Sequence, residues 1–309
     1  MTPIRFARRL LRASDRALAQ LEGELKQGLE QHPQPKLKVA PGERYDEVKD
    51  FVRSIDQPDQ SARNYLEIHL DRIARTMSMV PAPKRTGRAL ELGAYMHMTP
   101  ALHCVFEYEE VRGAYFGKLG RIDSKSVSVG GKEVFRCFVD HFDADRDRFP
   151  YEDNRFDLVL CCEMIEHLLL DPMHMLTEIQ RVLDDGGTLI LTTPNVANFT
   201  AVARMLHCGA NPQVFSMYPN PRGEFRDSEF PHVREYSPWE LDEAVRSAGF
   251  DIDYLFTEKI GNYTYDDWVR RFLERYGYPT EMRGEQMYCV AHKVAGAPII
   301  RYPKFLYDA

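Results

Sequence analysis

A Glu-x-x-Glu-His run at residues 163–167 places two carboxylates and an imidazole close together in the chain. If a helix begins there, Glu163, Glu166 and His167 are three and four positions apart and share one face. Such a set could bind a divalent cation such as Mg²⁺ or Mn²⁺, with His232 from a later segment as fourth ligand. The metal-free alternative makes His167 or His232 a general base, with the glutamates bonded to backbone amides.

Two other places carry residues suited to binding a ligand. Glu91 and Gly93 end a strand-like run, where glycine lets the backbone approach a ligand and a carboxylate can accept bonds from an amine. Asp143 and Ala144 end another such run, and they could accept an adenine amine and leave room for its flat ring. Alternatively, Gly93 is an ordinary glycine after a first strand, and Asp143 lies in a solvated acidic loop.

Alternating strand and helix patterns must position these residues. Strands are predicted at 88–93, 111–117, 134–143, 156–163, 187–194, 251–260 and 286–294. Helices are predicted from Thr99 as N-cap, over 172–183, and over 237–249 with Gly249 at the C-terminal cap. This alternation predicts a seven-stranded, mainly parallel, doubly wound α/β sheet, whose ligands bind beyond the carboxyl ends of the strands.

The flanking segments divide the chain into three parts. Residues 1–80 are expected to form a helical extension, in which a first helix over about 4–31 has five arginines in its first half. Two short helices follow it, the second with Ser61 as N-cap. Residues 81–294 form the main domain, with a lid insertion at about 196–236, and 295–309 form a C-terminal tail. The basic helix packs on its own chain or on a second copy in a homodimer, or residues 1–30 touch a membrane surface.

Composition narrows the classes of function. The 309 residues include 44% hydrophobic and 28% charged residues, which is typical of a packed globular protein, and the net charge of −7 disfavours nucleic acid as a partner. No run of about 18–20 apolar residues predicts a membrane span, and no signal peptide is evident. Six cysteines without CxxC pairing are expected as free thiols in a reducing compartment, so a cytoplasmic location is predicted.

One ordered set of short motifs carries a family resemblance. A strand beginning Phe156-Asp157 leads to Glu-His-Leu at 166–168, Arg-Val-Leu at 181–183, Gly-Gly at 186–187 and Thr-Pro-Asn at 193–195. This order and spacing resemble the class I S-adenosylmethionine-dependent methyltransferases, which have a Rossmann-like fold. The resemblance extends over about residues 88–294.

The resemblance implies a cofactor site for S-adenosyl-L-methionine. Glu91 and Gly93 would flank its methionine part, with Ala94 and Tyr95 continuing the loop. The residues implied at the adenine and at the floor near the sulfonium are Asp143, Ala144, Cys161, Cys162 and Glu163. The chain departs from the family in two ways: the loop has one glycine, and the second strand ends without the acid that usually holds the ribose hydroxyls.

The acceptor is expected to be a hydroxyl. The Glu-x-x-Glu-His run with His232 is similar to the metal-dependent 2′-O-methyltransferases of small RNAs and the ubiquinone-pathway O-methyltransferases. The aromatic lid and the His-x-Arg-Glu-Tyr segment at 232–236 resemble bacterial methyltransferases of glycan assembly. O-methylation of a sugar, glycan or related small molecule is therefore the leading hypothesis. The alternatives are N- or C-methylation of a small aromatic or amine, and a non-catalytic protein that binds a cofactor or partner; an oxidoreductase is disfavoured because Gly-x-Gly-x-x-Gly is absent.

Overall fold

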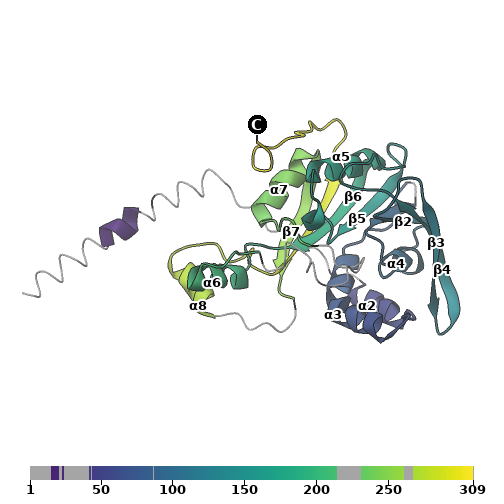
Figure 1. The fold of residues 1–309 in the computed structure, drawn as a ribbon, viewed down its shortest axis with the longest axis horizontal. Coiled ribbons are helices and arrows are strands. Elements are labelled where there is room, and N and C mark those ends of the chain that lie inside the picture. Colours follow the sequence, from purple (N-terminus) through teal and green to yellow (C-terminus); the bar gives the residue numbers. More distant parts are fainter. Residues whose placement is uncertain are drawn as a thin grey trace, which may run out of the picture.

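The architecture is a central sheet covered by helices on both faces (Figure 1). The structure, a computed structural model, describes residues 15–20, 23, 42, 44–85, 87–213, 231–260 and 267–308. The sheet has eight strands in the order β3-β4-β2-β1-β5-β6-β8-β7. Their bounds are β1 Arg88–Leu92, β2 Glu110–Tyr115, β3 Ile122–Val129, β4 Lys132–His141, β5 Phe156–Cys162, β6 Leu183–Pro194, β7 Phe250–Glu258 and β8 Gln286–Lys293.

Five neighbouring strands, from β4 to β6, run parallel, and β3, β8 and β7 are antiparallel to their neighbours. This confirms the predicted mainly parallel α/β sheet. The expected number of seven strands was one too few. The additional strand is β3, which forms a hairpin with β4 through Gly130 and Gly131 at φ of 58° and 78°. Two residues with positive φ are what a tight hairpin turn requires.

Helices lie on both faces of the sheet. Their bounds are α2 Tyr45–Ser54, α3 Gln60–Met77, α4 Thr99–Cys104, α5 Pro172–Val182, α6 Phe199–Cys208, α7 Pro238–Ser247 and α8 Asp267–Arg275. Apolar residues of α5 and α7 bury one face of the sheet. Residues of α2, α3 and α4 bury the other. The short helices before residue 80 therefore share a hydrophobic core with the sheet.

Helix starts differ from the predictions at two positions. Asp59, rather than Ser61, caps α3 by accepting a hydrogen bond of 2.8 Å from the backbone N–H of Ala62. Thr99 is the first residue of α4 rather than its cap, because its hydroxyl donates to Glu91. The start of α7 has Ser237 as N-cap with a reciprocal bond from Glu240, so the hydroxyl and carboxylate satisfy both exposed backbone donors.

Several predicted segments lie partly outside the described residues. Of the basic first helix, residues 15–20 and 23 are described and are helical. Of the lid insertion, α6 is described, whereas Phe215, Tyr218, Arg222, Phe225, Arg226 and Phe230 are not. Within the described ranges no helix combines the length and hydropathy needed to cross a bilayer.

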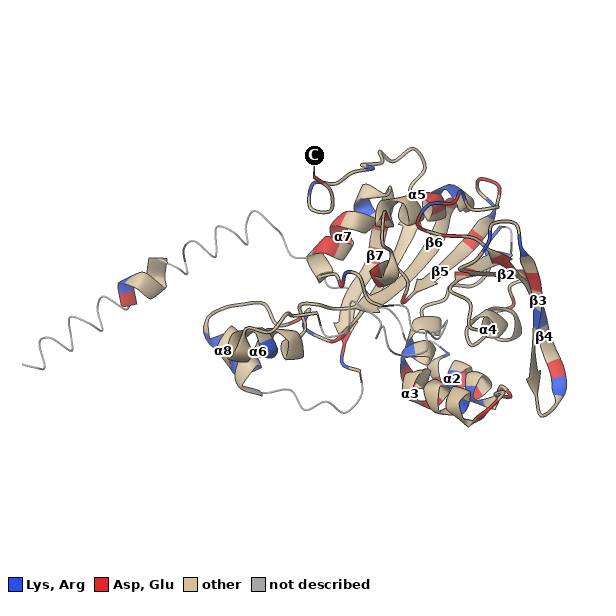
Figure 2. Cartoon of the chain, viewed as in Figure 1, with Lys and Arg blue, Asp and Glu red and all other residues tan. Residues whose placement is uncertain are grey.

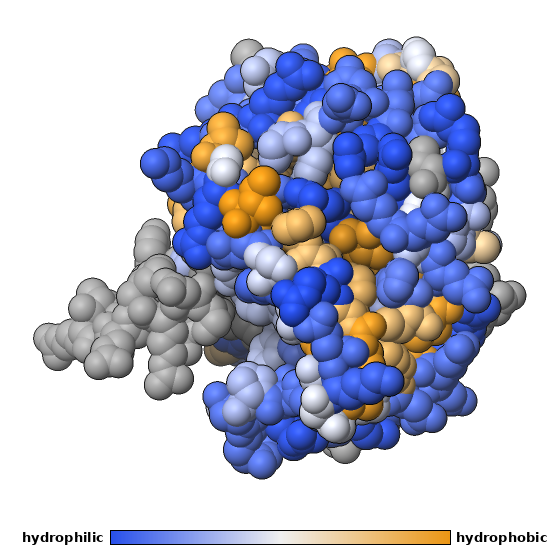
Figure 3. Space-filling view, turned by 90° about the vertical axis from the view of Figure 1, so that its right-hand side faces the viewer, coloured by the Kyte–Doolittle hydropathy of each residue, from blue (hydrophilic) through white to orange (hydrophobic). Residues whose placement is uncertain are grey.

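The surface beside β3 and β4 mixes hydrophilic and hydrophobic residues (Figure 3). At the opposite end, α6 and α8 pack on each other through Ala203, Val269 and Leu273. We call these two helices the α6–α8 lobe. It lies to one side of the main body of the sheet (Figure 1).

Candidate active site

The carboxyl ends of β1, β5 and β6 meet at one edge of the sheet. Leu92 of β1 pairs with Cys161 of β5, and Cys162 pairs with Thr192 of β6. The residues that follow these strands therefore lie side by side at the same level. In open α/β sheets this edge is the usual place for a ligand.

Glu91 lies inside the protein rather than at the surface of this edge. Its side chain is 1% exposed, and its carboxylate accepts a hydrogen bond from the Thr99 hydroxyl. Burial raises the pKa of Glu91 to about 7, although the bonds from Thr99 oppose that rise. The pair links β1 to the start of α4 and thereby fixes the loop between them.

The loop after β1 follows a course set by Gly93. Its φ of 69° is left-handed, and a Cβ at this position would lie 2.8 Å from Sδ of Met164. Ala94 is buried, and Tyr95 is 48% exposed. The Tyr95 and Tyr115 rings meet edge to face at 5.5 Å, with their hydroxyls 3.3 Å apart. Two phenol groups thus lie at the end of β2, where the class I methyltransferases that the sequence resembles usually have an acid that binds the ribose.

Asp143 follows β4 in a tight turn. One carboxylate oxygen accepts from the backbone N–H of Asp145 at 3.0 Å, and the other pairs with Arg146 at 2.8 Å. Ala144 beside it is 9% exposed and belongs to the hydrophobic core. The Asp145 carboxylate accepts from the backbone N–H groups of residues 169–171 at 2.6, 2.9 and 2.8 Å. It therefore ties the segment after β5 to the turn after β4.

Cys162 is the last residue of β5, and Glu163 follows it. Cys162 is 8% exposed, and burial raises the pKa of its thiol. Glu163 has φ of 54°, an unusual value for a residue other than glycine. One oxygen of its carboxylate accepts from Thr192 at 2.8 Å and from Gln286 at 2.7 Å, and it pairs with Arg72 at 3.1 Å.

Arg72 was not predicted from the sequence. It belongs to α3, its side chain is 12% exposed, and nothing in its spacing within that helix signals a partner 91 positions away. His69 lies one turn earlier, and burial lowers its pKa to about 4. The helices before residue 80 therefore supply a buried cation to the edge of the sheet.

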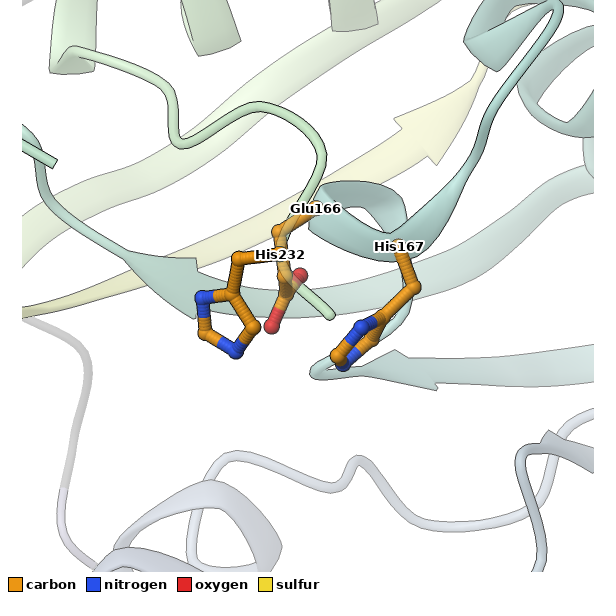
Figure 4. Close-up of side chains that lie close together, drawn as sticks. All are labelled: Glu166, His167 and His232. Carbon is orange, nitrogen blue, oxygen red and sulfur yellow. The ribbon is translucent and has the colours of Figure 1, made fainter. Parts of the chain in front are cut away.

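Glu166, His167 and His232 converge on one point. Ligand atoms from these three side chains lie within 4.8 Å of one another. Figure 4 shows the Glu166 carboxylate between the two imidazole rings, whose centroids are 4.8 Å apart. Glu166 is fully buried, and burial together with the charge of Glu163 raises its carboxyl pKa well above the ordinary value.

One oxygen of Glu166 accepts from the Thr193 hydroxyl at 2.9 Å, whereas Oε1 is buried with no hydrogen-bond partner among the described residues. Buried carboxylate oxygens are normally paired, so this atom suits a cation or a donor from a ligand. His167 and His232 direct Nδ1 to the Pro231 carbonyl at 3.1 Å and to Glu235 at 3.2 Å. Partners of this kind at the second nitrogen commonly orient metal-binding histidines.

Backbone pairing brings these distant residues together. The N–H groups of Val233 and Arg234 donate to the Glu166 carbonyl at 2.7 and 3.2 Å. Asn195 and Tyr236 form a parallel bridge beside them. The segment that carries His232 is thus attached to the residues that follow β5 and β6.

Glu163 does not belong to this cluster, although the sequence predicted it there. The expected helix over 163–167 is instead a left-handed residue at Glu163 followed by a short 3₁₀ turn, Ile165–His167. Since Glu163 has left the helical region, its carboxylate turns toward Arg72. The cluster therefore consists of three residues.

Sequence comparison assigns a family to part of this region. Residues 122–191 match the sequence model of a family described as a methyltransferase domain. These residues are therefore similar to a methyltransferase domain. The matched segment runs from β3 into β6 and includes Asp143 and Glu166. This confirms the predicted resemblance to the class I S-adenosylmethionine-dependent methyltransferases.

Solved structures with a similar fold include several methyltransferases. One from Archaeoglobus fulgidus, described as S-adenosylmethionine dependent, is 16% identical with a TM-score of 0.47, covering 76% of this chain and 100% of its own. A chain in the complex of the Haloferax volcanii Trm112 methyltransferase activator with its methyltransferase is 16% identical with a TM-score of 0.46, covering 80% and 98%. One from Bacillus halodurans is 17% identical with a TM-score of 0.43, covering 72% and 99%. No curated protein sequence matches this chain.

Proposed function

We propose that the methyltransferase domain transfers a methyl group from S-adenosyl-L-methionine to a hydroxyl of a sugar, glycan or related small molecule. A divalent cation held by Glu166, His167 and His232 is part of this proposal. The observation that carries it is the buried Oε1 of Glu166, which lies between two oriented imidazoles and has no hydrogen-bond partner in the described part of the chain. A hydroxyl is a poor nucleophile at neutral pH, and a cation at this position would lower its pKa and hold it in place.

The cofactor would supply the electrophilic methyl group. Toward it, the Asp143 carboxylate would accept a hydrogen bond from the adenine amine, and buried Ala144 leaves space beside the ring. The Tyr115 hydroxyl donates to that of Tyr95, so the Tyr95 hydroxyl would be the one that donates to the ribose. Glu163 is held by Arg72, which leaves its second oxygen as an acceptor for the amino group of the methionine part.

The cluster would act on the acceptor. Nδ1 of His167 donates to the Pro231 carbonyl in the tautomer that leaves the lone pair on Nε2. The Glu235 carboxylate beside Nδ1 of His232 favours the same tautomer in that ring. Two Nε2 atoms and one carboxylate can therefore face a common point, and the same nitrogens could accept the proton that the hydroxyl loses.

Cation binding and methyl transfer test this proposal together. Mn²⁺ titrated into the full chain should bind at one site, and Glu166→Gln or His232→Ala should weaken binding at least tenfold. His292→Ala is the matched control, because His292 also pairs with a carboxylate, Asp253 at 3.0 Å, outside the cluster. Equal Mn²⁺ affinity in wild type and Glu166→Gln would refute the cation site. Methyl transfer to amines, independent of divalent cations, would instead favour an N-methyltransferase.

A further inference from the structure

The α6–α8 lobe has apolar side chains on its outside as well as its inside. Ala203, Val269 and Leu273 are buried between the two helices. The outward side chains include four large hydrophobic residues, Met205 (46% exposed), Leu206 (52%), Phe272 (40%) and Tyr276 (36%). Single exposed apolar residues are ordinary, but four on two short helices form a surface that can bind a partner.

The aromatic residues of α8, together with Tyr276 directly after it, form a continuous row. Trp268, Phe272 and Tyr276 recur every four residues, with ring centroids 6.5 and 4.9 Å apart. His207 of α6 extends the row, since its ring lies 5.1 Å from that of Trp268. These rings meet edge-on or tilted, at interplanar angles of 55–66°, and together form a partly apolar ridge.

Exposed positive charge lies on the same two helices as this ridge. The two helices carry Arg204, Arg270, Arg271 and Arg275, of which Arg270 pairs with Glu274 at 3.6 Å, although the whole chain has a net charge of −7. The four arginines are exposed. Blue segments of the ribbon mark arginine positions on both helices in Figure 2. The lobe is therefore a basic, aromatic surface on an acidic protein.

From this combination we propose that the α6–α8 lobe docks on an anionic lipid bilayer. Tryptophan, tyrosine and phenylalanine rings enter the headgroup region of a membrane, and arginines beside them reach lipid phosphates. An acidic protein is repelled by such a surface unless a basic patch faces it, which is the charge arrangement found here.

The lobe is attached to the edge of the sheet that carries the candidate site. The backbone N–H of Phe199, at the start of α6, donates to the Arg283 carbonyl at 3.1 Å, and the Arg283 guanidinium donates to the Ala197 carbonyl at 2.8 Å. Residue 197 is two positions after Asn195, which bridges to the segment carrying His232. Docking would therefore bring the edge of the sheet at which the carboxyl ends of β1, β5 and β6 meet close to the lipid headgroups.

Vesicle cosedimentation with the full chain tests the proposal. Wild type should bind phosphatidylglycerol-containing vesicles at least tenfold more tightly than pure phosphatidylcholine vesicles. Phe272→Ser/Tyr276→Ser and Arg270→Glu/Arg271→Glu should each lose this binding. The matched controls, Ile122→Ser/Phe138→Ser and Lys118→Glu, alter exposed residues near β3 and β4 and should bind as wild type does.

A second measurement needs no change in the lobe. Trp239 and Trp268 are the two tryptophans of the chain, so Trp239→Phe isolates the fluorescence of Trp268. Brominated phosphatidylcholine in anionic vesicles should quench it. The proposal is overturned if anionic vesicles do not bind, or if both lobe variants bind like wild type, which would place the contact elsewhere, for example in residues 1–30. A wild-type dimer that the lobe variants dissociate, without vesicle binding, would also overturn it.

Discussion

Replacing the buried carboxylate of Glu91 by an amide should change how the protein's stability depends on pH. Burial raises the pKa of Glu91 to about 7 from an ordinary value of 4.5. The folded state therefore binds a proton that the unfolded state releases, so this group favours folding below pH 4.5 and loses that contribution as pH rises through 7. The pKa difference corresponds to about 3 kcal/mol at full ionisation.

Glu91→Gln keeps an acceptor for the Thr99 hydroxyl and removes the ionisation. Urea unfolding followed by circular dichroism, from about pH 4.5 to about pH 8, should show the variant gaining about 3 kcal/mol relative to wild type. Glu152→Gln, at an exposed residue, is the control and should show no such change. Parallel stability profiles for wild type and Glu91→Gln would refute the assignment of a buried, proton-binding Glu91.

Three further substitutions test the edge of the sheet. Gly93→Ala should lower the free energy of unfolding by about 1–3 kcal/mol, because φ of residue 93 is 69° and the new Cβ would crowd Met164. An unchanged midpoint of unfolding in guanidinium chloride would contradict this. Arg72→Ala should cost about 2–3 kcal/mol by leaving the Glu163 carboxylate without its cation, and adding Glu163→Gln should restore part of it; additive losses would argue against the pair. Asp145→Asn should weaken the hydrogen bonds from the backbone N–H groups of residues 169–171 by about 1–3 kcal/mol and so speed hydrogen exchange of these amides. Identical exchange in wild type and variant would show that the carboxylate does not hold residues 169–171 in place.

Local patterns predicted most of the framework of the fold. Alternating strands and helices with clear caps, such as Ser237 before α7, gave element positions that the structure confirms. Long runs of apolar residues in β5 and β6 indicate strands buried on both faces, which is what a parallel sheet requires. The strand β3 was missed because IDSKSVSV is rich in serine and has few apolar residues, so hairpin pairing through Gly130 and Gly131 decides its structure.

The candidate site depended more on contacts between distant segments. The sequence placed Glu166, His167 and His232 in one cluster, and the structure brings them together. It also placed Glu163 on a helical face with them, which proved wrong because contacts with Arg72, Thr192 and Gln286 outweigh local helix geometry. The charge supplied by α3 could not be predicted, since an arginine in an amphipathic helix is as often solvated as paired.

The most direct test of the central claim is calorimetry of the full chain with S-adenosylhomocysteine, the product form of the proposed cofactor. The account predicts saturable binding of one molecule per chain. Asp143→Ala should weaken it by about 1–3 kcal/mol through loss of the adenine acceptor. Absence of binding at millimolar ligand, or equal affinity in the variant, would contradict a cofactor site at this edge of the sheet.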